Sequence, residues 1–142
     1  MANSAPILLV EDNPDDAALT ELALRRSWPA QLEVARNAQE AVDYLFDDTK
    51  EVPPLVLLDL GLPGTGGFEV LRRIRENERT RLIPVVVLTS SMSPDDVAES
   101  YRLGANSYVR KPVDFDRFSD RIREVGAYWL GINEPPWNGL DT

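Results

Sequence analysis

LVLLDLGLPGTGGFEVL, residues 55–71, is an aliphatic run interrupted only by Asp59, followed by a loop with proline and glycine and then by a new apolar pattern. A short aliphatic run without polar alternation is typical of a strand buried on both faces, as in a parallel sheet. The pattern after the loop, residues 68–76, indicates a helix. This stretch therefore predicts one strand–loop–helix unit of an α/β fold.

Further runs of the same kind lie on both sides of this stretch. Residues 7–10 and 85–88 are equally apolar, and residues 32–35 and 107–109 are weaker candidates. Each interval between these runs is long enough for one crossover helix, which parallel strands require. We therefore expect a parallel sheet whose strands alternate with helices.

Helix boundaries are marked by capping residues. Asn13 and Ser93 are each followed by a proline and two acidic residues, the pattern of an N-cap and a first helical turn. A further helix is expected at residues 38–46, and Gly104 is expected to end the helix that follows Ser93. The first helix is expected to bury a face made by Ala18, Leu19, Leu22 and Ala23.

The last helix carries a regular apolar stripe, and a tail follows it. Apolar residues recur at intervals of 3, 4, 3 and 4 at Phe115, Phe118, Ile122, Val125 and Trp129. The pattern ends after Gly131, and residues 133–142, NEPPWNGLDT, are too short to form a domain. We expect one domain over residues 1–132 and a C-terminal tail over residues 133–142.

Composition excludes several kinds of chemistry. The 142 residues, 43% of them hydrophobic, suffice for one domain with one core. The chain contains no cysteine and no histidine, which excludes Cys/His zinc sites, cysteine nucleophiles, Ser-His-Asp triads and a phosphohistidine on this chain. A formal net charge of −9 disfavours nucleic-acid binding, so a protein partner is expected.

Targeting and membrane signals are not expected in this sequence. No run approaches the roughly 18 to 20 apolar residues of a membrane span. No basic segment followed by an apolar leader precedes Ile7. We therefore expect a cytoplasmic protein without a membrane partner.

Polar residues directly after the apolar runs are the candidates for function. In an open parallel α/β sheet, ligands bind beyond the carboxyl ends of the strands. The residues at those ends are Glu11, Asp12, Asp59, Thr89 and Lys111. Carboxylates that lie close together repel one another, and a divalent cation relieves that repulsion. An oxygen-only set of ligands favours Mg²⁺ or Mn²⁺ over zinc.

Each of these residues also has a structural interpretation. The pair Glu11 and Asp12 could serve only to cap the helix that follows. Thr89 could be an ordinary hydroxyl at a strand end, and Lys111 could be solvated. Asp59 could be a hydrogen-bonded structural residue, although a carboxylate beside an apolar strand is costly to bury without compensation. The joint pattern of complementary groups at several strand ends favours a functional site.

Four segments resemble the receiver domain of two-component response regulators. They are ILLVEDNPDD at residues 7–16, LVLLDLGLPGTGGFEVL at 55–71, VVVLTSS at 85–91 and LGANSYVRKP at 103–112. With their spacing they cover about residues 5 to 130, nearly the whole chain. The resemblance implies a three-layer, flavodoxin-like α/β fold with a five-stranded parallel sheet in the order 2-1-3-4-5 and five helices.

The resemblance implies a phosphorylation site with a bound cation. Asp59 would be the phospho-acceptor, and Mg²⁺ or Mn²⁺ would be held by Asp12, by Asp59, by the backbone carbonyl of Gly61 and, largely through water, by Glu11. No other cofactor is implied. The domain would catalyse its own phosphorylation and dephosphorylation and would have no other enzymatic activity.

The resemblance also implies a switch that responds to the phosphoryl group. The hydroxyl of Thr89 would move toward this group, and Lys111 would form an ion pair with it. Tyr108 would be the aromatic residue that changes rotamer. The Lys111–Pro112 bond is expected to be cis.

Two small residues stand at positions that, by the resemblance, would lie close to the phospho-acceptor. Gly61 and Ser91 stand two positions beyond Asp59 and Thr89, where members of this family control the access of water to the phosphoryl group. We therefore hypothesise that attack by water remains open in this protein.

The partners implied are a sensor histidine kinase and a downstream protein. The chain after Lys111 is only 31 residues long, so no output domain is expected, and the signal would leave through the face made by residues 94–103, 107–109 and 114–130. The segment 127–137, AYWLGINEPPW, resembles the tail of single-domain receivers paired with phytochrome-type kinases. That subgroup tends to form homodimers, here through the fourth and fifth helices and the tail. Alternatively, Tyr128, Trp129 and Ile132 pack on their own domain.

Two other functions are compatible with parts of the pattern. A phosphohydrolase of the haloacid-dehalogenase type also uses an aspartate, Mg²⁺, a hydroxyl and a lysine, but it needs a second aspartate where this chain has Gly61. A receiver-like binding module that works without phosphorylation would be expected to lack one of Asp12, Asp59, Thr89 or Lys111, and all four are present.

Overall fold

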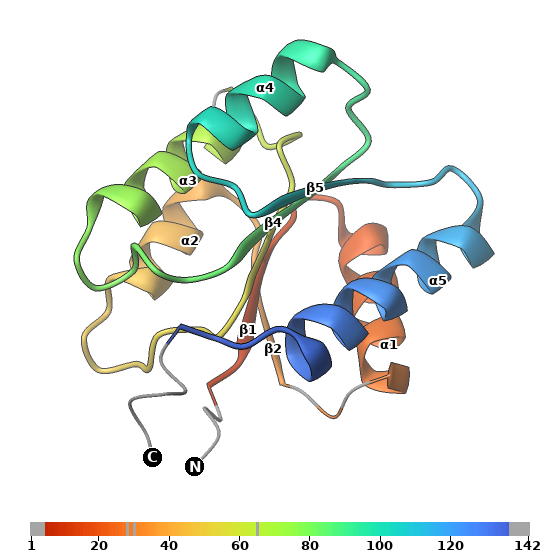
Figure 1. Ribbon diagram of the computed structural model, residues 1–142, viewed down its shortest axis with the longest axis horizontal. Coiled ribbons are helices and arrows are strands. Elements are labelled where there is room, and N and C mark those ends of the chain that lie inside the picture. The colour runs from red at the N-terminus through yellow and green to blue at the C-terminus, as the bar shows by residue number, and fades with distance from the viewer. Residues whose placement is uncertain (1–4, 28, 30, 65, 137–142) are drawn as a thin grey trace.

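A parallel sheet of five strands lies between two layers of helices in the computed structural model, which describes residues 5–27, 29, 31–64 and 66–136 (Figure 1). The strands are β1 (Ile7–Val10), β2 (Leu32–Ala35), β3 (Val56–Leu58), β4 (Val85–Thr89) and β5 (Ser107–Arg110). The helices are α1 (Pro14–Ser27), α2 (Ala38–Leu45), α3 (Gly66–Glu76), α4 (Pro94–Arg102), α5 (Phe115–Gly126) and the short π-helical segment η1 (Ala127–Ile132).

The sheet has the strand order β2-β1-β3-β4-β5, which confirms the expected fold. All neighbouring strands pair in parallel. Because β1 pairs with β3 and not with β2 alone, the strand order reverses beside β1. Ligands bind at this kind of reversal in open α/β sheets, outside the carboxyl ends of the strands.

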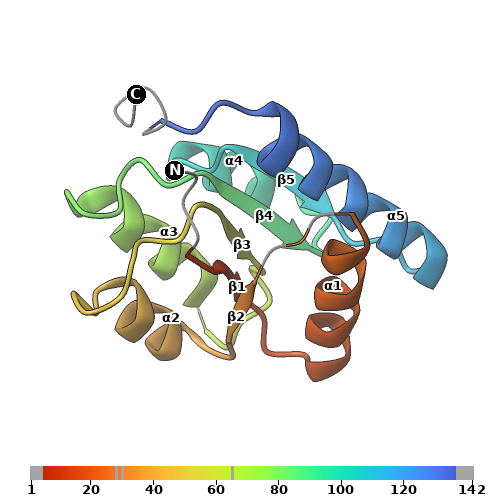
Figure 2. The ribbon, with the colours of Figure 1, turned by 90° about the horizontal axis from the view of Figure 1, so that it is seen from below.

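Alternate side chains of each strand enter different halves of the core. On β1, Ile7 and Leu9 belong to the cluster that packs against α1 and α5, whereas Leu8 and Val10 belong to the cluster that packs against α2 and α3. Figure 2 shows these two pairs of helices on opposite sides of the sheet. Both faces of the central strands are therefore buried, as the unbroken aliphatic runs predict.

The buried face of α1 differs from the expected one. Ala23 is buried as expected, but Ala18 and Leu22 are exposed and Leu19 is only half-buried. The buried residues are instead Ala17, Thr20, Ala23 and Leu24. Thr20 can occupy this face because its hydroxyl donates a hydrogen bond of 2.7 Å to the backbone oxygen of Asp16, which satisfies the buried donor.

The capping predictions are confirmed. The side-chain oxygen of Asn13 accepts hydrogen bonds from the backbone N–H groups of Asp15 and Asp16, and Ser93 caps α4. Gly104 follows the end of α4 with φ +104°, a conformation that favours glycine.

The apolar stripe of the last helix is confirmed only in its middle. Phe118, Ile122 and Val125 are buried, whereas Phe115 in the first turn is 56% exposed because the buried part of the stripe starts one turn later. Trp129 and its neighbour Leu130 lie in η1 and pack against the core shared by α1 and α5. Of the expected tail, residues 133–136 are described and residues 137–142, which include Trp137, lie outside the described residues. No helix in the described part of the chain is long and apolar enough to span a membrane.

Candidate functional site

The register of the sheet places two acidic residues side by side. Val10 at the end of β1 pairs with Leu58 at the end of β3, and the next residues in the chain are Glu11 and Asp59. The backbone N–H of Asp59 donates to the oxygen of Val10 over 3.0 Å, which holds the two strand ends together. The carboxylates of Glu11 and Asp59 therefore leave the sheet at the same edge.

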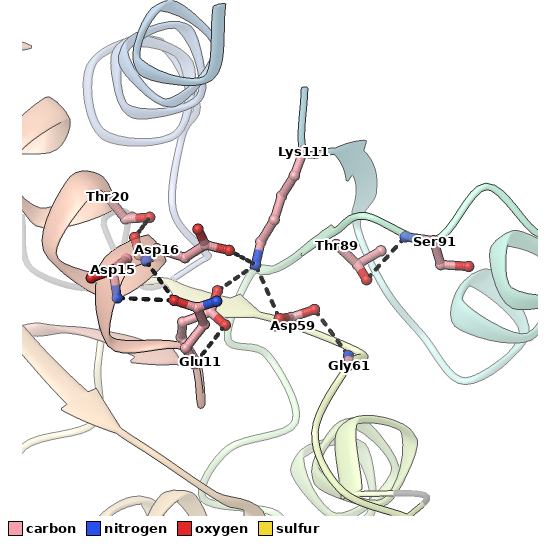
Figure 3. A network of polar contacts seen from close by, with 10 residues as sticks. Glu11, Asp15, Asp16, Thr20, Asp59, Gly61, Thr89, Ser91 and Lys111 are labelled. Atoms are coloured by element: carbon pink, nitrogen blue, oxygen red, sulfur yellow. Dashed lines mark hydrogen bonds and ion pairs between the residues drawn. The ribbon is translucent and has the colours of Figure 1, made fainter. Parts of the chain in front are cut away.

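Lys111 follows directly after β5, and its side chain extends to this same edge of the sheet. Its backbone N–H donates to the oxygen of Thr89 over 2.8 Å, which extends the pairing of β4 and β5 by one residue. Its Nζ atom lies 2.6 Å from Glu11 Oε1, 2.8 Å from Asp16 Oδ2 and 3.0 Å from Asp59 Oδ2 (Figure 3). The lysine side chain is 8% exposed, so all three contacts form in a largely buried setting.

Burial and charge shift the pKa values of these groups in different directions. Burial and a hydrogen bond shared with Asp59 raise the pKa of the Glu11 carboxyl to about 7. Burial also raises the pKa of Asp59, but hydrogen bonds with Glu11, with the Gly61 N–H and with Lys111 more than offset this, so the pKa lies below its ordinary value. Asp59 is therefore ionised at neutral pH.

The pKa of Lys111 also follows from these contacts. Burial lowers the pKa of this lysine, but the bonds to Asp16 and Glu11 and the charge of Asp59 raise it above its ordinary value. The ammonium group thus remains charged next to the carboxylates.

Three carboxylates could hold a metal ion. Glu11, Asp12 and Asp59 each offer an oxygen, and these oxygens all lie within 4.8 Å of one another. Asp12 is exposed, whereas Glu11 and Asp59 are buried, so the group opens to solvent on one side. Carboxylate oxygens are the ligands that Mg²⁺ and Mn²⁺ prefer, and the donor set fits such an ion. The N–H of Gly61 donates to Asp59 Oδ1 over 2.9 Å, and the role of its carbonyl stays a prediction.

Thr89 and Tyr108 are joined through the loop between β4 and α4. Thr89 is buried, and its hydroxyl oxygen accepts a hydrogen bond of 3.4 Å from the N–H of Ser91. The backbone oxygen of Ser91 accepts a bond of 3.1 Å from the hydroxyl of Tyr108. The side-chain hydroxyl of Ser91 donates to Asp96 Oδ2 over 2.6 Å. Ser91 therefore links the carboxyl end of β4 to β5 and to the first turn of α4.

Two of these contacts were not foreseen from the sequence. The sequence pattern indicates Asp16 only as an acidic residue in the first helical turn, whereas its carboxylate contacts Lys111. The pattern indicates the same for Asp96, whereas its carboxylate accepts a hydrogen bond from Ser91. In both helices the acidic residue lies three positions after the N-cap, on the turn that faces the strand end, and this spacing is the feature that could have indicated such a contact.

The expected cis bond between Lys111 and Pro112 is not found. Within the described ranges no peptide bond is cis. The trans form is the lower-energy one for most X–Pro bonds, and here it is compatible with the contact between Lys111 and Asp59.

The chain is similar to known proteins over nearly its whole length. The family of response regulator receiver domains matches residues 7–123. A relative from Methanothrix harundinacea, the probable methanogenesis regulatory protein FilR2, is 43% identical over 134 residues, which cover 92% of this chain and 86% of the relative.

Solved structures of response regulators match the fold closely. The Mn²⁺-bound form of Rcp1 has a TM-score of 0.87 and 35% identity over 93% of this chain and 99% of the other. The response regulator Rcp1 from Synechocystis sp. is 36% identical over 129 residues, which cover 87% of this chain and 88% of the relative. The phosphorylated cyanobacterial phytochrome response regulator RcpA has a TM-score of 0.88 and 34% identity over 94% of this chain and 99% of the other.

Proposed function

This chain belongs to the family of response regulator receiver domains, and on that premise we propose that it accepts a phosphoryl group on Asp59 in the presence of Mg²⁺ or Mn²⁺. The observation that carries the proposal is the contact of 3.0 Å between the ionised Asp59 carboxylate and the ammonium group of Lys111. This contact places a nucleophile and a group that neutralises phosphoryl charge within one hydrogen bond of each other.

The proposed reaction is a direct transfer to the carboxylate. An oxygen of Asp59 forms a bond to the phosphorus of acetyl phosphate or of a partner's phosphohistidine. The bond between phosphorus and the leaving group breaks, and acetate or imidazole departs with the electron pair. The product is an acyl phosphate, from which water later releases inorganic phosphate and regenerates the carboxylate.

The residues of the chain contribute position and charge to this transfer. The N–H of Gly61 holds one oxygen of Asp59, which fixes the rotation of the carboxylate. Lys111 places its charge at the other oxygen, and the Thr89 hydroxyl is available at the end of β4. A bound Mg²⁺ would supply further positive charge beside the transferred oxygens.

The proposed route for the signal leads from Thr89 to the face formed by α4, β5 and α5. Displacement of the Thr89 hydroxyl toward the phosphoryl group would remove the acceptor of the Ser91 N–H, and Ser91 also holds the Tyr108 hydroxyl. On this face a hollow is lined by Val97, Tyr101, Tyr108, Val109, Arg110 and Arg121. A change in Tyr108 would thus alter the surface that a partner contacts.

The proposed partners are a sensor histidine kinase of the phytochrome type and a second copy of this chain. The first follows from the likeness to RcpA, which is a phytochrome response regulator. For the second, Tyr128 and Ile132 are 46% and 70% exposed in η1, whereas Trp129 packs on its own domain. A gel-filtration profile of a monomer at tens of micromolar, both with and without beryllofluoride, would exclude the homodimer.

Acetyl phosphate tests the central proposal. The protein is incubated with this donor with and without Mg²⁺, and the intact mass is measured for the wild type, Asp59→Asn and Asp48→Asn. The wild type and Asp48→Asn, which changes an exposed carboxylate in the segment between α2 and β3, should gain one phosphoryl group only when Mg²⁺ is present. Asp59→Asn should gain none, and equal gain in Asp59→Asn would refute the assignment.

A further inference from the structure

Asp16 contacts Lys111 at the outer side of the site. Its Oδ2 atom lies 2.8 Å from Nζ, and its side chain is 32% exposed, compared with 8% for Lys111. In Figure 3 the ammonium group is drawn between Asp16 on α1 and Asp59 after β3. The third acceptor of the ammonium is Glu11, so its three hydrogens each have a carboxylate partner.

The backbone of Asp16 is fixed by bonds that do not involve Lys111. Its N–H donates to Asn13 Oδ1 over 3.1 Å, and its backbone oxygen accepts from the buried hydroxyl of Thr20 over 2.7 Å. Both backbone polar groups of Asp16, the N–H and the C=O, are therefore hydrogen-bonded within the start of α1. Asp16 can thus act as a fixed anchor, because its position does not depend on Lys111.

The carboxylate of Asp16 is not needed to cap the start of α1. In a capping box a glutamate or glutamine three positions after the N-cap accepts the N–H of the N-cap residue. Here that N–H, from Asn13, donates to Glu11 Oε2 over 3.2 Å instead. The Asp16 side chain is therefore directed to Lys111.

Asp16 differs from the other two acceptors of the ammonium. Glu11 and Asp59 belong to the group that could hold a cation, and that group contains Asp12 as its third member rather than Asp16. In the proposed function Asp59 must also carry the phosphoryl group. Neither Glu11 nor Asp59 can therefore hold Lys111 in the same way throughout the reaction, whereas Asp16 can.

We propose that Asp16 is a positioning residue that keeps the ammonium group of Lys111 beside Asp59 while Glu11 and Asp59 engage the cation and the phosphoryl group. The proposal rests on the proposed function of Asp59. Removal of this anchor would let the lysine side chain move in the site. Small displacements of a group that neutralises charge in the transition state cost about 10-fold to 100-fold in rate.

The negative charge of Asp16 also affects the phosphorylation rate in the opposite direction. A carboxylate near the site also repels the phosphodonor, so its loss alone would increase the rate. Asp15 provides the matched control because it lies in the same turn of α1, is exposed, and donates its N–H to the same Asn13 oxygen. Asp15→Asn removes the same charge from the same helix end and leaves the contact with Lys111 intact.

Lysine NMR gives a readout that is independent of the reaction. The chain contains two lysines, Lys50 and Lys111, so a ¹⁵N spectrum of the Nζ groups has two signals, and the exposed Lys50 is an internal reference. In the wild type without Mg²⁺, the Lys111 signal should exchange slowly with water because all three hydrogens are bonded. In Asp16→Asn it should shift and exchange at least about 10-fold faster, since an amide is a weaker acceptor than a carboxylate.

The kinetic arm measures the initial rate of phosphorylation by acetyl phosphate at saturating Mg²⁺. We expect Asp16→Asn to be about 10-fold slower than the wild type and Asp15→Asn to stay within about twofold. An unchanged or faster rate in Asp16→Asn, or an unchanged Lys111 signal, would overturn the proposal. If the wild type itself takes up no phosphoryl group, the proposed function fails, and the NMR comparison still decides whether Asp16 holds Lys111.

Discussion

The Nζ atom of Lys111 lies 2.6 Å from Oε1 of Glu11, although 100 positions separate the two residues in the chain. Their side chains are 8% and 1% exposed, so the contact is shielded from water, and it is an ion pair whenever Glu11, whose pKa is raised to about 7, has lost its proton. Burying two charges costs free energy that is recovered only when both find good partners. The lysine provides such a partner to Glu11, Asp16 and Asp59 together, and it is the positive charge that compensates this acidic edge when no cation is bound.

Replacement of Lys111 by methionine should therefore destabilise the ligand-free protein. The side chain keeps a similar length, but the carboxylates lose their common partner, and breaking a buried ion pair typically costs about 3 to 5 kcal/mol. We expect a loss near the lower end, about 3 kcal/mol, because Asp16 is partly exposed to water. Urea unfolding without Mg²⁺ measures the difference.

Mg²⁺ and a second lysine provide the controls for this prediction. Excess Mg²⁺ should restore stability to Lys111→Met more than it stabilises the wild type, because it binds a site with greater unrelieved repulsion. Lys50→Met changes an exposed lysine and should leave the unfolding midpoint nearly unchanged. Equal midpoints for the two variants without Mg²⁺ would contradict the role assigned to Lys111.

The affinity for Mg²⁺ should increase with pH. In the ligand-free protein the pKa of Glu11 is raised to about 7, so this carboxyl carries a proton below that pH. A cation binds the deprotonated form, so binding releases a proton and is weakened as the pH falls through this value. Between pH 6 and pH 8 we expect an increase of about 10-fold in affinity, the change that one linked proton produces.

Calorimetric titration with Mg²⁺ across this range checks the pH dependence. Glu11→Gln cannot take up the proton, so its affinity should vary much less with pH than that of the wild type. A wild-type affinity that is flat between pH 6 and pH 8 would show that the proton on Glu11 is not linked to the cation.

The sequence predicts the edge of the sheet that carries the site because strand ends are local features. Aliphatic runs that stop at Val10 and Leu58 place Glu11 and Asp59 at the carboxyl ends of two strands. This prediction uses only the residues of each run and does not depend on the rest of the chain. The adjacency of these strands came from the family resemblance, since parallel pairing is not encoded in either run. The carboxylates were thus predicted as a group, but their distances were not.

The missed features depend on contacts between distant parts of the chain. The apolar pattern of α1 could not reveal that Thr20 is buried, because a threonine becomes acceptable in the core only once its hydroxyl binds the backbone of Asp16. Similarly, Asp16 follows every rule for a first-turn residue, and its contact with Lys111 arises only when residues 95 positions apart meet. Periodicity and capping rules describe single helices and cannot register such pairs.

Gly67 should not tolerate a side chain. A Cβ atom at this position would lie 2.8 Å from the Cα of Leu60 and 2.9 Å from the backbone oxygen of Asp59, and neither atom can move without shifting the loop after β3. Gly67→Ala should therefore destabilise the fold by about 2 kcal/mol or more and disturb the position of Asp59. Urea unfolding and Mg²⁺ titration measure the two effects.

The neighbouring glycine provides a matched control for this variant. A Cβ atom at Gly66 would meet the side chains of Leu62 and Ala38 at 3.2 and 3.4 Å, which is tight but does not involve backbone. Both glycines lie in the first turn of α3, so the gain in helix propensity on changing to alanine is similar. If Gly67→Ala is as stable as Gly66→Ala, the close approach of α3 to Asp59 is not a constraint.

Gly61 should determine how quickly a phosphoryl group is lost from Asp59. A Cβ atom at this position would lie 3.4 and 3.5 Å from the two oxygens of Asp59, so any side chain here stands next to the phosphorylated carboxylate. Among the described residues, the glycines with positive φ are Gly64 and Gly104, and Gly61 is not one of them. A side chain at Gly61 therefore adds no strain from a left-handed backbone conformation. Gly61→Arg should slow hydrolysis by about 10-fold or more, since the side chain obstructs the approach of water and its charge binds the phosphoryl oxygens.

The decay of the phosphorylated protein after removal of acetyl phosphate measures this rate, with Gly61→Ala as the variant that adds only a methyl group. Decay of Gly61→Arg at the wild-type rate would mean that water reaches the phosphoryl group from another side.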